Sequence, residues 1–205
     1  MNATPDTLDS AKTRRFQEKR ERILDAAATL INRHGVRGMT FVDVAQLVDL
    51  NTTSITYYFK RKELLASAVL ERSLERIEAL IEDAARGRTP QERIARYIRS
   101  NFELQAAINA QEERPVAVLS DIRALNEPYN SDLTARYVQV FRKLRTFFDP
   151  PRNDEEKVLS TIRAHVLVQN MFWLPAWISQ YSTGDYDRVC KRLIELFETG
   201  FAPKG

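Results

Sequence analysis

The stretch from Thr40 to Lys62, TFVDVAQLVDLNTTSITYYFKRK, most constrains the fold of this chain, because it is patterned as two short helices joined by a tight turn. Thr40 is a good N-cap for the first helix, and Asp43 supplies the second half of a capping box. Residues 49–51, Asp-Leu-Asn, then interrupt the apolar periodicity with residues that tolerate left-handed backbone geometry. The chain is therefore expected to turn here and to begin a second helix.

This second helix has an apolar and a polar face. Asn51 is a suitable N-cap, and Ile55 and Phe59, one turn apart, are placed to pack on the first helix. The other face carries hydroxyl and phenol groups without net charge, which suits a recognition helix that reads base edges. An ordinary helical hairpin with a solvated outer face would have the same pattern. The residues of this face are Thr52, Thr53, Ser54, Thr56, Tyr57 and Tyr58.

Residues 12–35, KTRRFQEKRERILDAAATLINRHG, extend the pair to a three-helix unit. They read as a longer helix with apolar residues at helical spacing, stopped by Gly35. A run of cations at the leading end usually marks a solvated helix end, but beside a helix-turn-helix it favours contact with a phosphate backbone. These cations are Lys12, Arg14, Arg15, Lys19, Arg20 and Arg22.

The order ILDAAATLINRHGVRGMTFVDVAQLVDLNTTSITYYFKRKELLASAVL resembles the N-terminal domain of the TetR (tetracycline repressor) family of transcriptional regulators. The resemblance covers roughly the first third of the chain. It implies a regulator that binds a palindromic operator in double-stranded DNA as a homodimer. By this resemblance Thr40 and Lys62 contact phosphates and Tyr57 lies against the backbone, and we place Asn51 in the same site. The residues implied to face the major groove are Thr52, Thr53, Ser54, Thr56 and Tyr58.

Two positions depart from the family pattern. Asp49 stands where the family usually has glycine in the turn, so we expect some cost in turn stability. Thr56 stands where a tyrosine is usual, which removes a phenol that commonly touches DNA. The base preference of a relative therefore does not transfer to this chain.

The composition, with 43% hydrophobic and 29% charged residues in 205, is that of a globular chain. The net charge of +3 is modest, so affinity for DNA has to come from the basic N-terminal end. Cys190 is the single cysteine, which excludes an internal disulfide, and the N-terminus lacks the apolar core of a signal peptide. The apolar stretch 166–178 is too short to span a bilayer. We expect a cytoplasmic protein with no membrane partner.

Low glycine content and the lack of alternating strand patterns predict an all-α fold. We expect an N-terminal arm and helix-turn-helix DNA-binding domain in residues 1–62. A larger C-terminal helical domain for effector binding and dimerisation follows in residues 63–205. Its predicted helices span about 62–85, 90–102, 115–124, 128–148, 153–180 with a disturbance at Pro175, and 185–199.

The last two predicted helices carry more apolar surface than one flank of a small monomer needs. By the resemblance they pair with a second copy in a four-helix bundle, which gives a homodimer suited to a palindromic operator. Simple core packing is the alternative. The stripes are Leu167, Phe172, Leu174 and Trp177 in the first helix, and Val189, Leu193, Leu196 and Phe197 in the second.

By the same resemblance the middle helices hold a pocket for a small, largely hydrophobic effector with one or two hydrogen-bonding groups. Ordinary core packing is an alternative for each candidate, and His165 could contact a ligand or satisfy a backbone carbonyl. The candidates are Tyr97, Phe102, Tyr137, Phe141, His165, Gln169, Phe172 and Trp173.

Catalysis has little support in the sequence. The histidines are His34 and His165, and there is no glycine-rich phosphate loop and no Cys/His metal pattern. We therefore expect no enzyme activity, no cofactor and no metal. The leading hypothesis is a repressor released from its operator by the effector. The alternatives are a DNA-binding activator or co-regulator without small-molecule input, and an enzyme or ligand carrier on a helical scaffold.

Overall fold

The computed structural model describes residues 5–200, with side chains from Thr13 onward. This part of the chain consists of α-helices and two 3-10 helices without a β-strand, which confirms the all-α prediction. Packing divides the chain into two compact units: unit 1 contains the residues up to Ser73 and Pro115–Thr134, and unit 2 contains Leu74–Arg114 and the residues from Ala135. The units differ from the predicted division after Lys62, because helices α4 and α6 each begin in one unit and end in the other.

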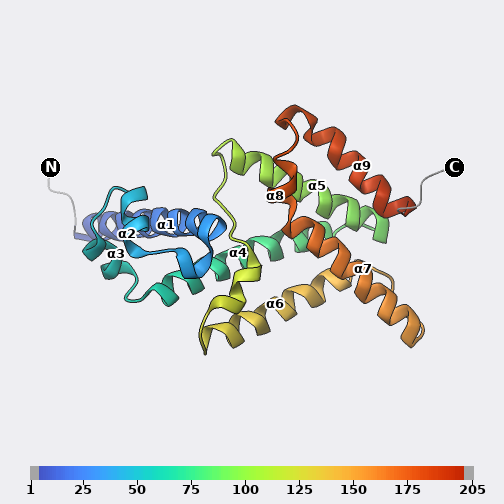
Figure 1. The fold of residues 1–205 in the computed structure, drawn as a ribbon, viewed down its shortest axis with the longest axis horizontal. Helices are drawn as coiled ribbons and strands as arrows, with labels where there is room; N and C mark the ends of the chain where they lie inside the picture. The colour runs from blue at the N-terminus through green and yellow to red at the C-terminus, as the bar shows by residue number, and fades with distance from the viewer. Residues whose placement is uncertain (1–4, 201–205) are drawn as a thin grey trace. The chain divides into compact units, whose positions relative to one another are not determined.

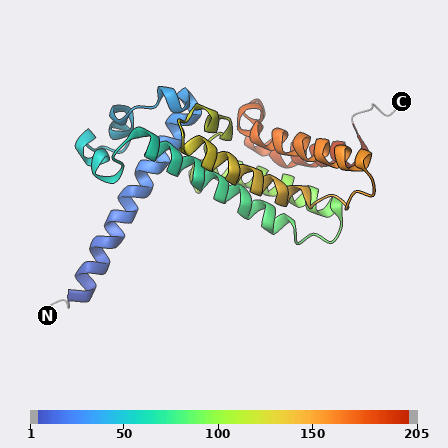
Figure 2. The same ribbon diagram turned by 90° about the horizontal axis from the view of Figure 1, so that it is seen from below.

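Unit 1 is built around the N-terminal helices (Figure 1). Its core is formed by buried side chains such as Ile23, Ala27, Val44 and Ile55. The elements that contribute to it are α1 (Pro5–Gly38), α2 (Phe41–Leu47), α3 (Thr52–Tyr58), the first half of α4 (Lys62–Ala84), the 3-10 helix η1 (Leu119–Ala124) and the start of α6 (Tyr129–Arg145). The first turns of α1 extend past α2 and α3 (Figure 2).

The long helix within α1 ends at Gly35, as predicted. Gly35 is non-helical, with φ 71 and ψ 169, and a short helical stretch follows this kink to Gly38. Glycine suits this position for two reasons: the positive φ favours it, and a Cβ would lie 3.0 Å from Asp121 Oδ2. The same carboxylate oxygen accepts a hydrogen bond from the Val36 amide at 2.6 Å.

In unit 2, helices α8 and α9 pack against α5, and α7 contacts α8 (Figure 1). Thr89 and Asn153 cap α5 and α7 through their side-chain oxygens. The disturbance predicted at Pro175 is confirmed, because the helix is interrupted at Trp173 and resumes with Pro175 in its first turn. The further elements are α5 (Pro90–Asn109), α7 (Asp154–Phe172), α8 (Leu174–Ile178), η2 (Thr183–Asp185) and α9 (Tyr186–Thr199).

Two predicted elements differ in the structure. The segment expected to be helical from Pro115 is extended up to Val118 and then forms the 3-10 helix η1, because its backbone bonds to other parts of unit 1. The apolar stretch 166–178 of the predicted helix 153–180 is expected to be buried but is partly exposed, with Trp173 62% exposed. Among the described residues no helix has the length and apolar character needed to cross a membrane.

The apolar stripe predicted for the penultimate helix is wrong in its choice of residues. Leu167 and Leu174 are buried within the chain's own core, at 0% and 2% exposure. A different face of the same segment is exposed, because α7 is apolar on more than one side. The exposed large apolar side chains on α7, at its end and on α9 are Val158, Leu159, Ile162, Val166, Trp173 and Leu196.

Candidate DNA-binding site

Helix α2 begins at the predicted residue. Thr40 is the N-cap, and its Oγ1 accepts a hydrogen bond from the Asp43 amide at 3.2 Å. The same hydroxyl donates to Asp43 Oδ2 at 2.7 Å, so the carboxylate bonds to the capping side chain. The Thr40 hydroxyl thus uses both its donor and an acceptor position in the helix cap. Its predicted phosphate contact stays a prediction.

The turn between α2 and α3 depends on a left-handed residue. Asp49 has φ 55, which explains why glycine is usual at this position in the resembled family. The turn is closed by a hydrogen bond from the Leu50 amide to the Ala45 carbonyl at 2.9 Å. Arg22 of α1 donates from Nη2 to the Val48 carbonyl at 3.0 Å, so α1 also holds the end of α2.

Helix α3 has the two faces that its sequence predicts. Asn51 caps it through Oδ1, which accepts from the Ser54 amide at 2.7 Å. Ile55 and Phe59 are buried, as predicted. On the outer face, Thr56 Oγ1 donates back to the Thr52 carbonyl at 3.0 Å. The remaining outer residues are exposed or half-buried, and they are Thr52, Thr53, Ser54, Tyr57 and Tyr58.

An aromatic cluster joins α1 to α3, and sequence reasoning missed it. The Phe16 ring lies 4.7 Å from the Tyr58 ring and 6.1 Å from the Tyr57 ring, centroid to centroid. One turn further along α1, the Arg20 guanidinium lies over the Phe59 ring at 5.3 Å. The available signal was that Phe16 stands seven residues, about two helical turns, before the core residue Ile23.

The basic end of α1 therefore has two kinds of cation. Arg20 and Arg22 contact the helix-turn-helix, whereas Arg14, Arg15 and Lys19 are exposed to solvent. Arg14 also makes a weak surface pair with Glu18 at 3.6 Å. Lys12, which the sequence grouped with these cations, lies outside the residues with described side chains.

Cations at the start of α4 bond within unit 1. Lys62 Nζ donates to the Arg37 carbonyl at 3.1 Å, near the end of α1. Arg61 Nη2 donates to the Tyr129 hydroxyl at 3.1 Å. Lys62 thus has a structural contact in addition to its predicted role at a phosphate, which remains a prediction.

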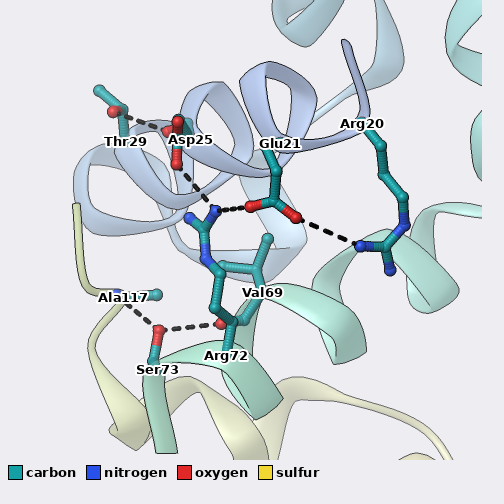
Figure 3. A network of polar contacts seen from close by, with 8 residues as sticks. All are labelled: Arg20, Glu21, Asp25, Thr29, Val69, Arg72, Ser73 and Ala117. Carbon is teal, nitrogen blue, oxygen red and sulfur yellow. Dashed lines mark hydrogen bonds and ion pairs between the residues drawn. The ribbon is translucent and has the colours of Figure 1, made fainter. Parts of the chain in front are cut away.

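A polar network links α1, α4 and the segment before η1 (Figure 3). Arg72 is 20% exposed, and its Nη1 lies 3.1 Å from Glu21 Oε2 and 2.8 Å from Asp25 Oδ1. The neighbouring Ser73 is buried and accepts a hydrogen bond from the Ala117 amide at 2.9 Å. The segment 115–118 is therefore fastened to the body of unit 1.

Asn32 of α1 makes a second fastening to the same segment. Its Nδ2 donates to the Val116 carbonyl and its Oδ1 accepts from the Val118 amide, each at 2.9 Å. One side chain thus bonds to a backbone carbonyl and to a backbone amide of a segment that does not pair with a β-strand.

Four residues of the predicted effector pocket come together in unit 2. Tyr137 and Phe141 of α6 stack at 6.2 Å, and Phe141 stacks on His165 of α7 at 4.4 Å. Phe172 lies 6.2 Å from the Tyr137 ring. All four are exposed or half-buried, so this aromatic cluster is accessible. Partial burial raises the pKa of the Tyr137 phenol.

The other predicted pocket residues are placed differently. Tyr97 is fully buried against Phe147 at 5.8 Å, and within the described residues its Oη has no hydrogen-bond partner. Burial raises the pKa of the Tyr97 phenol, and this effect outweighs the opposite effect of the nearby Asn101 side chain. Phe102 packs in the core edge-to-face on Trp177 at 5.9 Å, whereas Gln169 and Trp173 are exposed.

A separate hollow of about 560 Å³ lies at another part of unit 2. It is bordered by the start of α5, the segment 148–152, the first half of α7 and the end of α9. None of the predicted effector residues lines it.

The fold and this site define a helix-turn-helix DNA-binding protein, with a polar recognition helix held by a capped partner helix and a basic α1. The model for "Bacterial regulatory proteins, tetR family" matches residues 23–69, which contain all of α2 and α3. Residues 23–69 therefore form a DNA-binding segment of the TetR type.

Curated relatives also match part of the chain. The repressor KstR of Mycolicibacterium smegmatis is 31% identical over 109 residues, which are 53% of this chain and 50% of KstR. The chain spans half the length or less of the curated relatives it matches.

Likeness to solved structures extends over most of the chain. A TetR-family regulator from Bordetella parapertussis superimposes with a TM-score of 0.72 at 19% identity, covering 91% of this chain and 98% of that one. AibR, solved with isovaleryl coenzyme A and operator DNA, gives a TM-score of 0.66 at 17% identity, covering 86% and 97%. At these identities the likeness concerns the fold alone.

Proposed function

We propose that the protein is a sequence-specific transcriptional repressor that binds a palindromic operator as a homodimer and is released by a small, largely hydrophobic effector. The helix-turn-helix carries this proposal: α3 is capped, anchored by two buried apolar residues, and presents an outer face without charge. Such a face supplies donors, acceptors and methyl groups to base edges in the major groove. A regulator of this kind would act on DNA in the cytoplasm.

The proposed DNA contacts divide by exposure. Thr52, Thr53 and Thr56 are exposed on α3 and are assigned to base edges, together with the half-buried Ser54 and Tyr58. Contacts with the DNA backbone are assigned to residues at helix ends and to the Tyr57 phenol of α3. Those residues are Thr40, Asn51, Tyr57 and Lys62, and Tyr57 is 66% exposed.

Dimerisation is proposed through the last two helical segments, and the exposed apolar face of α7 supports it. Val158, Ile162 and Val166 recur at about one-turn intervals and are 59%, 52% and 37% exposed. Monomeric proteins rarely leave such a stripe in water, and a two-fold partner would cover it. An Ile162→Glu protein is expected to sediment as a monomer, with exposed Gln139→Glu on α6 as the charge-matched control. Equal dimerisation of both variants would contradict this assignment.

The effector is proposed to bind at the aromatic cluster of Tyr137, Phe141, His165 and Phe172. Stacked rings suit a planar or acyl group, and none of these four side chains is a carboxylate or guanidinium. A ligand can shift DNA affinity only by binding the two states differently, and α4, which runs through both units, is the proposed connection.

A second candidate is a DNA-binding activator or co-regulator without small-molecule input. The packing of Tyr97 on Phe147 and of Phe102 on Trp177 favours this second candidate, because these two predicted pocket residues are part of the protein's own core. A ligand screen by thermal shift separates the candidates. A compound that raises the melting temperature and weakens operator binding supports the repressor. A His165→Ala protein should then keep its DNA affinity and lose part of the response.

The first experiment is selection of DNA sites from a random pool with the wild type and with a Thr52→Ala/Tyr58→Ala protein, at two salt concentrations. An inverted repeat that the wild type enriches and the variant does not would support a dimeric sequence-specific regulator. Salt-sensitive retention without an enriched site would reduce the activity to non-specific binding. Selection of the same site by the variant would contradict the assigned base contacts.

A further inference from the structure

We infer that Phe16 is a positioning residue for the recognition helix: its ring, carried by the first turns of α1, orients the two tyrosines with which α3 meets DNA. This inference rests on the proposed function. Phe16 belongs to no catalytic or core assembly, and its role would be to act on DNA through Tyr57 and Tyr58.

The geometry is that of a closed aromatic triad. The ring of Phe16 is tilted by 32° over Tyr58 at 4.7 Å and meets Tyr57 edge-on, at 79° and 6.1 Å. The two tyrosine rings also meet edge-on, at 5.3 Å and 89°. Each ring thus contacts the other two, and aromatic pairs in such arrangements attract one another beyond simple area burial.

The triad lies at the surface, so core packing does not explain it. Tyr57 is 66% exposed, and Phe16 and Tyr58 are half-buried. Among the α1 residues with described side chains, the first that is fully buried is Ile23, about two turns beyond Phe16. An exposed phenol without neighbours would sample several rotamers, and contact with a fixed ring restricts them.

Two further contacts of α1 lead from this triad to the turn. Arg20 lies over the Phe59 ring at the end of α3, and Arg22 donates to the Val48 carbonyl at the end of α2. Phe16, Arg20 and Arg22 therefore hold successive parts of the helix-turn-helix from one helix. The exposed Arg14, Arg15 and Lys19 flank Phe16, so the element that orients the tyrosines also carries charge toward the phosphates.

Because the two tyrosines are already oriented, they should lose less conformational entropy when the protein binds DNA. Immobilising a rotamer-rich side chain at an interface is costly, and a side chain already held in its bound orientation avoids part of that cost. With two tyrosines released, a Phe16→Ala protein is expected to bind its operator about 5- to 30-fold more weakly. Affinity for non-specific DNA depends on charge and should remain unchanged.

The test compares Phe16→Ala, Phe16→Tyr and the exposed-neighbour control Gln17→Ala on the operator selected by the wild type. We expect Phe16→Ala to lose affinity with an unchanged salt dependence, Phe16→Tyr to restore the affinity, and Gln17→Ala to match the wild type. An Arg14→Ala/Arg15→Ala protein should instead reduce the salt dependence. In a Tyr58→Leu background the effect of Phe16→Ala should shrink.

Wild-type affinity in Phe16→Ala would overturn the inference, as would an equal loss on non-specific DNA or no rescue by tyrosine. These outcomes differ from failure of the proposed function. In that case the wild type itself would select no DNA site, and the inference would fall with it.

Discussion

Removal of the Ser73 hydroxyl should destabilise unit 1 more than an ordinary serine truncation, because it leaves a buried backbone amide without a hydrogen-bond acceptor. Ser73 Oγ donates to the Val69 carbonyl at 2.8 Å and accepts from the Ala117 amide at 2.9 Å. In a Ser73→Ala protein the Val69 carbonyl still lies within the hydrogen-bonded body of α4. The Ala117 amide, in a residue only 2% exposed, loses its partner to a methyl group.

The magnitude follows from that stranded donor. A buried amide left without an acceptor costs about 1–3 kcal/mol, whereas loss of the hydroxyl's own donation to an already bonded carbonyl costs little. For a chain of this size each kcal/mol lowers the melting temperature by about 2–4 °C, so we expect a decrease of about 2–12 °C. The comparison requires a fixed protein concentration, because dimerisation contributes to stability.

The assay combines thermal unfolding with hydrogen exchange at the Ala117 amide. Exposed Ser179, whose hydroxyl donates to the Ala176 carbonyl at 2.8 Å, provides the matched control as Ser179→Ala. Ser73→Ala should melt lower than the control and exchange faster at Ala117. If the two variants melt together and Ala117 stays protected, the segment 115–118 is not fastened as described.

Three further predictions follow from other parts of the chain. Hydrogen bonds and charge from Lys143 and Arg136 lower the pKa of the Glu78 carboxyl below its ordinary 4.5, so its stabilisation is present above pH 4.5 and is lost as pH falls through the lowered value. The free energy of unfolding of Glu78→Gln should therefore be lower than that of the wild type at pH 7, and the difference should become smaller as the pH is lowered. A difference that does not change with pH would contradict this prediction. Asp49→Gly should raise the free energy of unfolding in urea by up to about 1 kcal/mol, because it relieves the left-handed φ, and a decrease would count against strain in the turn. Burial raises the pKa of the Cys190 thiol, so at pH 8 it should react with a thiol reagent far more slowly in the native protein than in urea. Equal rates would show that the thiol is accessible.

The helix-turn-helix could be read from sequence because its signals are local. The caps at Thr40 and Asn51 each satisfy an amide three residues away, and the positive φ of Asp49 belongs to a residue type that tolerates it. The buried face of α3 follows from a one-turn spacing. Each of these features lies within a few residues of the amino acid that determines it, so no knowledge of the tertiary fold is needed.

The fastening of the segment 115–118 could not be read in this way. Asn32 bonds to Val116 and Val118 across 84 and 86 residues, and Ser73 bonds to Ala117 across 44. Nothing near Pro115 indicates which polar side chains will meet its backbone, and a helical continuation was the better local reading. The same holds for Phe16, whose partners on α3 lie about forty residues further along the chain.

Helix α7 illustrates a second limit, since apolar residues lie on more than one of its faces. A helix that is hydrophobic on several sides lacks the periodicity that separates a core face from an interface. The sequence-based choice of Leu167 and Leu174 as partner-facing was reasonable by composition, yet these residues fill the protein's own core. The solvent-exposed side of α7 carries Val158, Ile162 and Val166. The apolar composition of α7 therefore did not show which face is buried, but it did predict more apolar surface than one face needs. A helix with more apolar surface than its own unit can bury points to a second chain, which agrees with the proposed homodimer.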